Sequence, residues 1–357
     1  MSGRLRIAFL TSTPLDFARG SGTFVGIVTL AHAARRLGAE VRLLSPSGRF
    51  PVYTLERLWF NEQLRRYDLR GFDVVVGFDL DGWRIAGRHG LPHVASIKGV
   101  VADEMRFEHG ATRWTLGVQA ACERVHVRRA DRVLAPSRYA ARRIQELYGL
   151  AEPPRIVPEC IDVEDWRELR AAHPAQPAPA AFTVLSVCRF YPRKRLQVLL
   201  GAAARLRGRI PGLEVRIVGR GPQEARLRRL WRELGLESTV RWLGDLPQEE
   251  LARQYQACDV FCLPSVQETF GVVFLEAMAA GKPIVAARAA AVPEVVEEGL
   301  LVEPESVEDL SEALQRLHSD PGLRRSLGEA GPRIAANYDA PRVAGLFLSE
   351  LAALTSG

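Results

Sequence analysis

Short apolar segments alternate with helical patterns along the whole chain, and this alternation restricts the possible fold more than any other feature. We expect strands at 5–11, 41–45, 73–77, 93–97, 132–135, 183–187, 215–219, 240–244, 260–264 and 284–287, most of them followed by a glycine-bearing or polar turn and a helix. Alternating strands and helices favour parallel sheets covered by helices. The pattern therefore predicts an α/β protein with two Rossmann-like, doubly wound domains facing a cleft.

The length of 357 residues also suggests two domains, each large enough to bury a core of its own. The clearest linker is 171–181, AAHPAQPAPAA, which contains three prolines and has no hydrophobic periodicity. We therefore expect one domain at 1–170, a linker at 171–181 and a second domain at 182–340.

Several classes of protein are disfavoured by composition. No run of about 18 apolar residues is present, so a membrane span is not expected. The amino end, MSGRLRIAFLTS, has an apolar run of four residues and is interpreted as a first strand rather than a signal peptide. The five cysteines are scattered, which is typical of buried reduced thiols. These features predict a cytoplasmic protein.

The positive charge is concentrated in the first half. Residues 1–170 contain 26 Lys and Arg against 20 Asp and Glu, whereas residues 171–357 contain 22 of each. This excess suits an anionic acceptor or peripheral contact with the inner membrane face. Arginine-rich solvated helix faces explain it equally well. The stretch 49–67 is expected to be irregular, and it mixes aromatic residues with arginines. Such a segment could contact lipid headgroups. The alternative is that its aromatic side chains face the core and its arginines face water.

The most informative motif is 264–283, PSVQETFGVVFLEAMAAGKP. An apolar helix is expected from about 271 to 280, ended by Gly281 and Pro283. Glu276 lies in its middle and Glu268 lies in the loop before it. A buried carboxylate needs a donor partner or a ligand, and the helix entrance suits a phosphate. The simplest ligand with hydroxyls for two carboxylates and a phosphate between them is a nucleotide sugar. A structural helix with one satisfied glutamate is the alternative.

This motif resembles the signature of the large family of retaining glycosyltransferases with the GT-B fold (family 4, group 1 type). The resemblance implies that Glu268 faces the donor sugar hydroxyls and that Glu276 binds the ribose diol. It also implies that the amides of Phe270, Gly271 and Val272 contact the donor sugar or phosphate. In that architecture the last helix, at 341–357, packs back on the first domain.

Further matches to the family follow other strands. Arg189 and Lys194 match its cation pair on the donor diphosphate, where fixed cations stabilise the charge of the leaving group. A solvated basic cluster is the alternative for these two residues. Gly219 precedes a tight turn expected near the nucleotide, and Gly22 lies in the loop RGSGT that in the family approaches the donor diphosphate and acceptor.

Two positions depart from the family pattern. Lys98 stands at a strand end where a histidine is common, and it could donate to a leaving phosphate or an anionic acceptor; a surface lysine paired with Asp103 or Glu104 is the alternative. Glu159 and Cys160 replace the usual Asn-Gly, and neither receives a role. The pair Asp79 and Asp81 is assigned to structure or acceptor contact, and no metal is inferred.

The predicted function is a retaining hexosyl transfer from a UDP- or GDP-sugar to a hydroxyl acceptor, such as a glycan, a lipid-linked sugar or a small molecule. No further cofactor is expected. The alternatives are a nucleotide-sugar epimerase, a phosphorylase or a non-catalytic nucleotide-sugar-binding protein. A pyridoxal-dependent phosphorylase would need a Schiff-base lysine, for which Lys282 is the candidate. Nucleic-acid binding is not expected, because the basic excess forms no concentrated patch.

Overall fold

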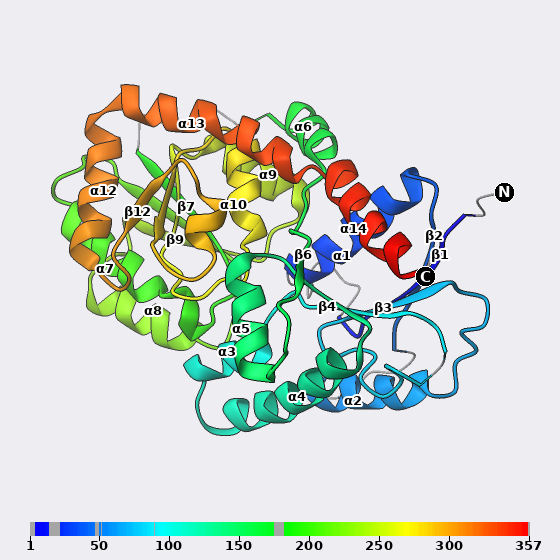
Figure 1. The fold of residues 1–357 in the computed structure, drawn as a ribbon. Coiled ribbons are helices and arrows are strands. Elements are labelled where there is room, and N and C mark those ends of the chain that lie inside the picture. The colour runs from blue at the N-terminus through cyan, green and yellow to red at the C-terminus, as the bar shows by residue number, and fades with distance from the viewer. Residues whose placement is uncertain are drawn as a thin grey trace. The chain divides into compact units, whose positions relative to one another are not determined.

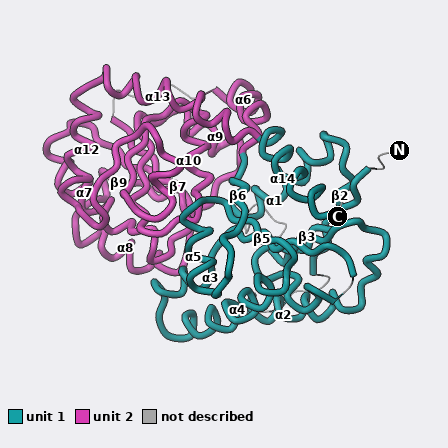
Figure 2. The backbone as a smooth tube through the Cα atoms, in the orientation of Figure 1, with its two compact units in different colours: residues 1–160, 340–357 teal, residues 161–339 magenta. Residues whose placement is uncertain are grey.

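The chain forms two compact units, residues 1–160 with 340–357 and residues 161–339 (Figure 2). The coordinates are a computed structural model, and they describe residues 4–13, 22–46, 50, 52–88, 90–174 and 182–355. Each unit contains one six-stranded, all-parallel sheet with surrounding helices (Figure 1). The predicted fold class of two parallel α/β units is confirmed.

In the first unit the sheet order is β2-β1-β3-β4-β5-β6. Its strands are β1 (Arg6–Leu10), β2 (Glu40–Leu44), β3 (Val74–Phe78), β4 (His93–Ser96), β5 (Arg132–Ala135) and β6 (Arg155–Ile156). Its helices are α1 (Gly22–Arg36), α2 (Tyr53–Leu64), α3 (Val101–Glu104), α4 (Gly110–Arg129), α5 (Arg138–Tyr148) and α14 (Ala340–Thr355). The short strand β6 was not expected, because two residues are too few to show a period.

Helix α14 completes the core of the first unit although it comes from the end of the chain. Phe347 is fully buried and packs edge-on against Phe9 of β1, with ring centroids 5.7 Å apart. The helix also lies beside α1, as Figure 1 shows. Val343, Ala344 and Leu351 are further buried residues of the same face. The apolar spacing of α14 therefore reflects burial against β1 and α1.

In the second unit the sheet order is β12-β11-β10-β7-β8-β9. Its strands are β7 (Thr183–Val187), β8 (Glu214–Val218), β9 (Val240–Gly244), β10 (Val260–Leu263), β11 (Ile284–Ala287) and β12 (Leu300–Val302). Its helices are α6 (Val163–Ala172), α7 (Leu196–Leu206), α8 (Glu224–Glu233), α9 (Gln248–Ala257), α10 (Val272–Ala279), α11 (Val292–Val295), α12 (Val307–Ser319) and α13 (Pro321–Ala335). The edge strand β12 was not expected.

The boundary between the units differs from the expected position. It falls between Cys160 and Ile161, ten residues before the boundary at 170, and α6 belongs to the second unit. The reason is packing: Trp166 is buried in a cluster with Tyr255 and Leu275, and its indole Nε1 donates to the carbonyl of Glu276 at 3.3 Å. Residues 175–181 of the expected linker lie outside the described residues.

The stretch 49–67 also differs from expectation. Most of it is the helix α2, and two of its aromatic side chains, Tyr53 and Trp59, are 41% and 49% exposed. Arg57 is buried instead, because it lies 3.5 Å from Asp81 and donates a hydrogen bond to Gln119 at 3.1 Å. The interpretation with aromatics inside and arginines outside is therefore wrong for these residues. The buried acids Asp79 and Asp81 lie within 4 Å of Arg57, and an arginine in that position compensates their charge.

Helix α10 is fixed in place by close packing against α13. A Cβ atom added at Gly331 would lie 2.7 Å from the carbonyl oxygen of Met278, and one at Gly328 would lie 2.5 Å from that of Gly281. Glycine at these positions of α13 thus lets its backbone approach the end of α10. The helix that contains Glu276 is consequently held on one side by α13 and on another by Trp166 of α6.

Candidate active site

The predicted donor residues of the second unit lie at one edge of its sheet. Strands β10, β7, β8 and β9 are neighbours in that order, and all are parallel. The loops that follow them contain Glu268, Arg189 with Lys194, Gly219, and Asp245, respectively. The carboxyl ends of parallel strands are where open α/β sheets bind ligands. This edge is therefore the candidate active site of the second unit.

Lys194 and Glu268 form a direct ion pair. The Nζ atom of Lys194 donates to Oε1 of Glu268 at 2.6 Å, and the two side chains are only 13% and 9% exposed. The loops are also joined through their backbones, because the amide of Val266 donates to the carbonyl of Arg193 at 2.9 Å. Charge-assisted hydrogen bonds of this kind are short and strong at low exposure. Two residues 74 positions apart are thus held in one place.

Arg189 points to a different partner, which the sequence did not indicate. Its guanidinium lies 3.6 Å from Asp245, and Arg220 lies 3.8 Å from the same carboxylate. All three side chains are at least one-third exposed, so these contacts are weak and easily exchanged for a ligand. Asp245 follows β9 immediately and comes 56 residues after Arg189, so no local spacing signals the pair.

Glycine allows the loops after β7 and β8 to touch. Gly219 has φ of +117°, and a Cβ atom there would lie 2.0 Å from the carbonyl oxygen of Cys188. A Cβ atom at Gly221 would lie 2.5 Å from the amide nitrogen of Phe190, which donates to the carbonyl of Arg220 at 3.0 Å. No other residue type fits this approach without moving one loop. Gly219, which precedes the expected tight turn, and Gly221 within that turn thus allow the backbones of the two loops to make contact.

Helix α10 begins at Val272, immediately after Gly271, which has φ of +94°. Phe270 is buried and packs edge-on against Tyr338, with ring centroids 5.3 Å apart. The first amides of a helix have no carbonyl partners within the helix. Phe270 and Gly271 therefore fix where those amides begin, directly after the loop that carries Glu268.

Glu276 has one partner that sequence reasoning missed. The hydroxyl of Tyr255, on α9, donates to Oε2 of Glu276 at 2.7 Å. Burial raises the pKa of Glu276, and the hydrogen bond from Tyr255 opposes that shift. Among the residues that the structure describes, none donates a hydrogen bond to Oε1. The glutamate is half satisfied, which leaves one oxygen for a ligand.

Lys282 is used by the fold. Its Nζ atom donates to the backbone carbonyls of Gln256 and Cys258, each at 2.8 Å. These bonds tie the turn after α10 to the end of α9. An ammonium engaged with two carbonyls is a poor Schiff-base nucleophile, which needs a deprotonated amine. The position of Lys282 therefore argues against a pyridoxal-dependent phosphorylase.

In the first unit the two departures from the family pattern meet. The Nζ atom of Lys98 lies 2.9 Å from Oε1 of Glu159, and the two side chains are 5% and 7% exposed. Asp103, an alternative partner for Lys98, is instead bonded by Tyr139 at 2.6 Å and by Arg143 at 3.0 Å. Lys98 is thus a buried lysine rather than a surface one.

Asp79 holds the backbone around Lys98. It has φ of +54°, and its Oδ1 accepts hydrogen bonds from the amides of Lys98 at 2.8 Å and Gly99 at 3.2 Å. Arg57 lies 3.8 Å from Asp79 and 3.5 Å from Asp81. An arginine in contact with both acids supports the structural interpretation of this pair. In the described part of the chain, no group of three or more His, Cys, Asp or Glu is arranged to hold a metal ion.

The buried position of Asp79 predicts a pH-dependent stability. Burial raises its pKa to about 6, against the attraction of Arg57 and the two amides. A raised pKa stabilises the folded state below the unfolded value near 4, and this contribution is lost as the pH rises through 6. We expect Asp79→Asn, which tolerates positive φ, to gain about 2–3 kcal/mol relative to the unchanged protein between pH 4.5 and pH 8. Urea unfolding at both pH values measures this difference, and an equal difference at both would contradict it.

Gly22 is the first residue of α1 and is exposed. A Cβ atom there would meet no atom within 4 Å, so no steric demand for glycine is present. Residues 14–21, which include most of the expected glycine loop, lie outside the described residues. The proposed donor role of Gly22 therefore stays a prediction.

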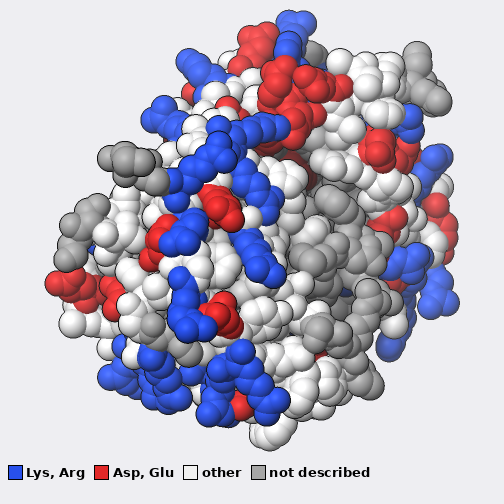
Figure 3. All heavy atoms as spheres, turned by 90° about the vertical axis from the view of Figure 1, so that its right-hand side faces the viewer, with Lys and Arg blue, Asp and Glu red and all other residues white. Residues whose placement is uncertain are grey.

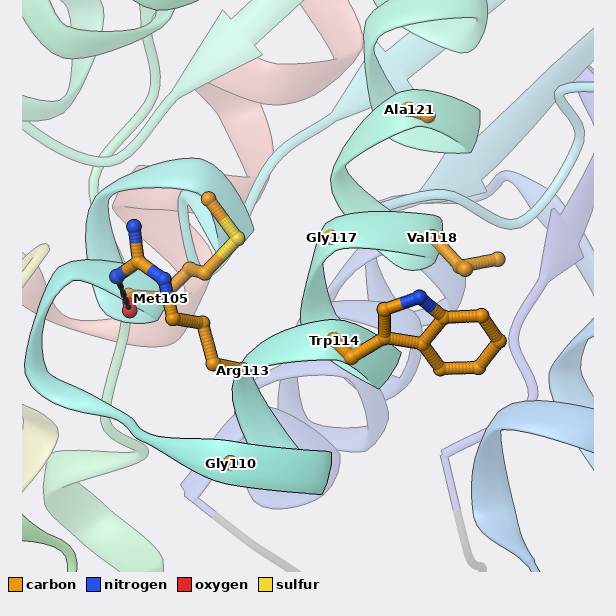
Figure 4. Close-up of a pocket in the computed structure, with 7 residues that line it drawn as sticks. All are labelled: Met105, Gly110, Arg113, Trp114, Gly117, Val118 and Ala121. Atoms are coloured by element: carbon orange, nitrogen blue, oxygen red, sulfur yellow. Dashed lines mark hydrogen bonds between the residues drawn. The ribbon is translucent and has the colours of Figure 1, made fainter.

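The first unit also contains a pocket whose lining includes none of these residues (Figure 4). It is lined by Met105, Gly110, Arg113, Trp114, Gly117, Val118 and Ala121, and Arg113 donates to the carbonyl of Met105 at 2.9 Å. It contains no predicted site residue.

On the face shown in Figure 3, acidic and basic side chains are interspersed. Within the described ranges, no helix is long and apolar enough to cross a membrane.

Comparison with known proteins covers nearly the whole chain. A model of "Glycosyl transferases group 1" matches residues 171–334, and a model of "Glycosyltransferase Family 4" matches residues 20–165. A D-inositol 3-phosphate glycosyltransferase from Nocardia farcinica is 35% identical over 77% of this chain and 63% of its own length. One from Kribbella flavida is 32% identical over 72% of this chain and 63% of its own length. The chain thus spans less than two-thirds of these relatives.

Solved structures agree in fold. A sucrose-phosphate synthase from Thermosynechococcus elongatus has a TM-score of 0.83 at 23% identity, covering 98% of this chain and all of its own. The Anabaena protein HepE, in complex with UDP-glucose, has a TM-score of 0.76 at 20% identity, with coverage of 98% and 100%. The two family models, which match the two halves in the expected order, confirm the resemblance. The chain therefore belongs to the family 4, group 1 glycosyltransferases and has their GT-B fold.

Proposed function

We propose that the protein transfers a hexosyl group from a nucleotide diphosphate sugar to a hydroxyl acceptor, with retention at the anomeric carbon. The observation that carries the proposal is the buried Lys194–Glu268 pair, which lies at the carboxyl edge of the second sheet and directly before α10. The names of the curated relatives and the UDP-glucose complex of HepE are consistent with such a reaction.

The residues have distinct roles in this proposal. Arg189 and Lys194 stabilise the diphosphate as the bond between C1 and the phosphate oxygen breaks. Glu268 binds the donor sugar hydroxyls and Glu276 binds the ribose diol. The acceptor oxygen forms the new bond to C1 on the same face, and its proton passes to the departing phosphate oxygen. A donor with an α-linkage then gives an α-linked product.

Two other functions make different demands on the same site. A non-catalytic binding protein would bind nucleotide sugars without consuming them, and an epimerase would change the sugar without an acceptor. Acceptor-dependent release of free nucleoside diphosphate therefore distinguishes the transferase from both. The ion pair of Lys98 with Glu159 gives the first unit a built polar position for an acceptor, which a binding protein would not need.

The first experiment is a thermal-shift panel with UDP, GDP, UDP-glucose, UDP-N-acetylglucosamine and GDP-mannose. Ligands that bind only the folded protein raise its Tm, and a ligand at about 100 times its Kd adds about 2.7 kcal/mol. We expect one nucleoside diphosphate and its sugar to raise Tm, and Lys194→Ala to reduce that rise. The base that binds defines the donor for assays of nucleoside diphosphate release. A panel in which no ligand changes Tm would contradict the proposal.

A further inference from the structure

The Lys98–Glu159 pair contains an unused acceptor atom. Oε1 of Glu159 lies 2.9 Å from the Nζ atom of Lys98 in an ion pair, and Oε2 has no such partner among the described residues. Both oxygens are buried, and neither receives a hydrogen bond from any residue that the structure describes. The whole residue is 5% exposed. A buried carboxylate oxygen without a donor is costly, and native proteins keep such an atom mainly where a ligand or water completes it.

The position of Oε2 is fixed from several sides. A Cβ atom at Gly26 would lie 2.5 Å from Oε2, so glycine in α1 provides the space that the carboxylate occupies. Lys98 is fixed in turn, because its own amide donates to Asp79 at 2.8 Å. Glu159 follows β6 and Lys98 follows β4, at the carboxyl edge of the first sheet. The pair is thus a rigid, built polar position on the ligand edge of that unit.

The charges decide which ligand fits. The ammonium of Lys98 is already compensated by Glu159, so the pair is neutral and offers no net attraction to a phosphate. Oε2 accepts hydrogen bonds only, and it would repel a phosphate oxygen at close range. A neutral hydroxyl can donate a hydrogen bond to Oε2, and it meets no charge repulsion there.

We propose that Glu159, positioned by Lys98, binds a neutral hydroxyl of the acceptor and thereby selects an unphosphorylated polyol over its phosphate monoester at that position. This inference rests on the proposed transferase function and adds the acceptor class. Lys98 is a positioning residue in it.

The test measures acceptor binding to the UDP- or GDP-loaded protein, using whichever nucleotide raises Tm. The probes are glucose and glucose 6-phosphate, and myo-inositol and its 3-phosphate, with Kd obtained from saturation-transfer NMR titrations. We expect at least one neutral polyol to bind about 10-fold or more tightly than its phosphate. A hydrogen bond to a charged group is typically worth such a factor.

Glu159→Gln keeps the shape but removes the carboxylate and leaves the Lys98 ammonium uncompensated. We expect the preference for the neutral probe to fall about 10-fold or to reverse. The matched control is Glu350→Gln, which removes the partner of Arg132 in the same unit and should leave the preference unchanged. If Glu159→Gln does not fold, the double variant Lys98→Gln with Glu159→Gln removes both charges and should weaken neutral binding without gaining phosphate binding.

The inference would be overturned if the phosphates bound more tightly than the neutral polyols, or if none of the four probes bound to the nucleotide-loaded protein. An unchanged preference in the variants would also overturn it. These results leave the transferase proposal standing, because the Tm rise with nucleotide and the release assay are measured separately. Failure of every nucleotide to raise Tm is the distinct result that counts against the transferase itself.

Discussion

Replacing Lys194 with alanine should lower kcat for nucleoside diphosphate release by about 100- to 1000-fold. The physical reason is that a preorganised cation at the leaving group acts where negative charge develops, and removing one such group typically costs a factor of this size. Lys194 is held at 2.6 Å from Glu268 and is 13% exposed, so solvent cannot replace it cheaply. Release of nucleoside diphosphate at saturating donor and acceptor measures the effect.

The control is Arg195→Gln, in the adjacent residue. Arg195 pairs with Glu305, which is 56% exposed, so a change of less than about threefold is expected there. Because Lys194→Ala leaves the buried Glu268 without its ion pair, Tm must be measured for both variants. A Tm close to that of the unchanged protein shows that a loss of activity in Lys194→Ala reflects lost catalysis and not lost folding. Near-normal kcat in folded Lys194→Ala protein would remove the proposed leaving-group role.

Glu276→Gln should raise the Kd of the nucleoside diphosphate by about 10- to 100-fold, with a smaller effect on kcat. A carboxylate accepts hydrogen bonds from both hydroxyls of a ribose diol, whereas an amide retains one acceptor; hydrogen bonds to charged groups contribute about 1.5–3 kcal/mol. The open Oε1 atom, beside the Oε2 atom bonded by Tyr255, is the structural basis. Calorimetric titration of the nucleotide measures Kd.

The pH dependence provides an independent readout for Glu276. Burial raises its pKa, so the carboxylate gains a proton at a higher pH than an exposed glutamate would. Nucleotide affinity of the unchanged protein should therefore fall as the pH falls toward that pKa, and the fall should be smaller in Glu276→Gln. Tyr255→Phe, which removes the hydroxyl bonded to Oε2, should raise the pKa further and shift the fall to higher pH. Identical pH profiles for all three proteins would contradict a direct role of the carboxylate.

Much of the fold follows from local pattern. The strands expected at 183–187 and 284–287 match β7 and β11, because buried parallel strands appear as short apolar runs. The strand expected at 240–244 matches β9, an edge strand on which Val240 is the buried residue. The family was recognisable from the 264–283 motif, since loop and helix together fix the positions of two carboxylates. The strands β6 and β12 escaped detection because short edge strands contain too few residues to show a period.

What sequence could not provide is the pairing of distant charges. Glu159 received no role, yet it pairs with Lys98, 61 positions earlier. Arg57 was expected in water, yet Asp81 and Gln119 hold it inside. Tyr255 has no distinguishing neighbours in sequence, and only the packing of α9 beside α10 brings its hydroxyl to Glu276. Such partners depend on tertiary placement, which single-residue types and spacings do not encode.

The return of α14 has a consequence for biosynthesis. A ribosome makes the strands of the first unit's sheet early, but Phe347, which packs against Phe9, is translated only after residues 161–339. While residues 161–339 are being translated, the apolar face of the nascent sheet that α14 covers in the folded protein stays without that native partner. The earlier-made half should thus mature after the later-made one, the reverse of the usual order.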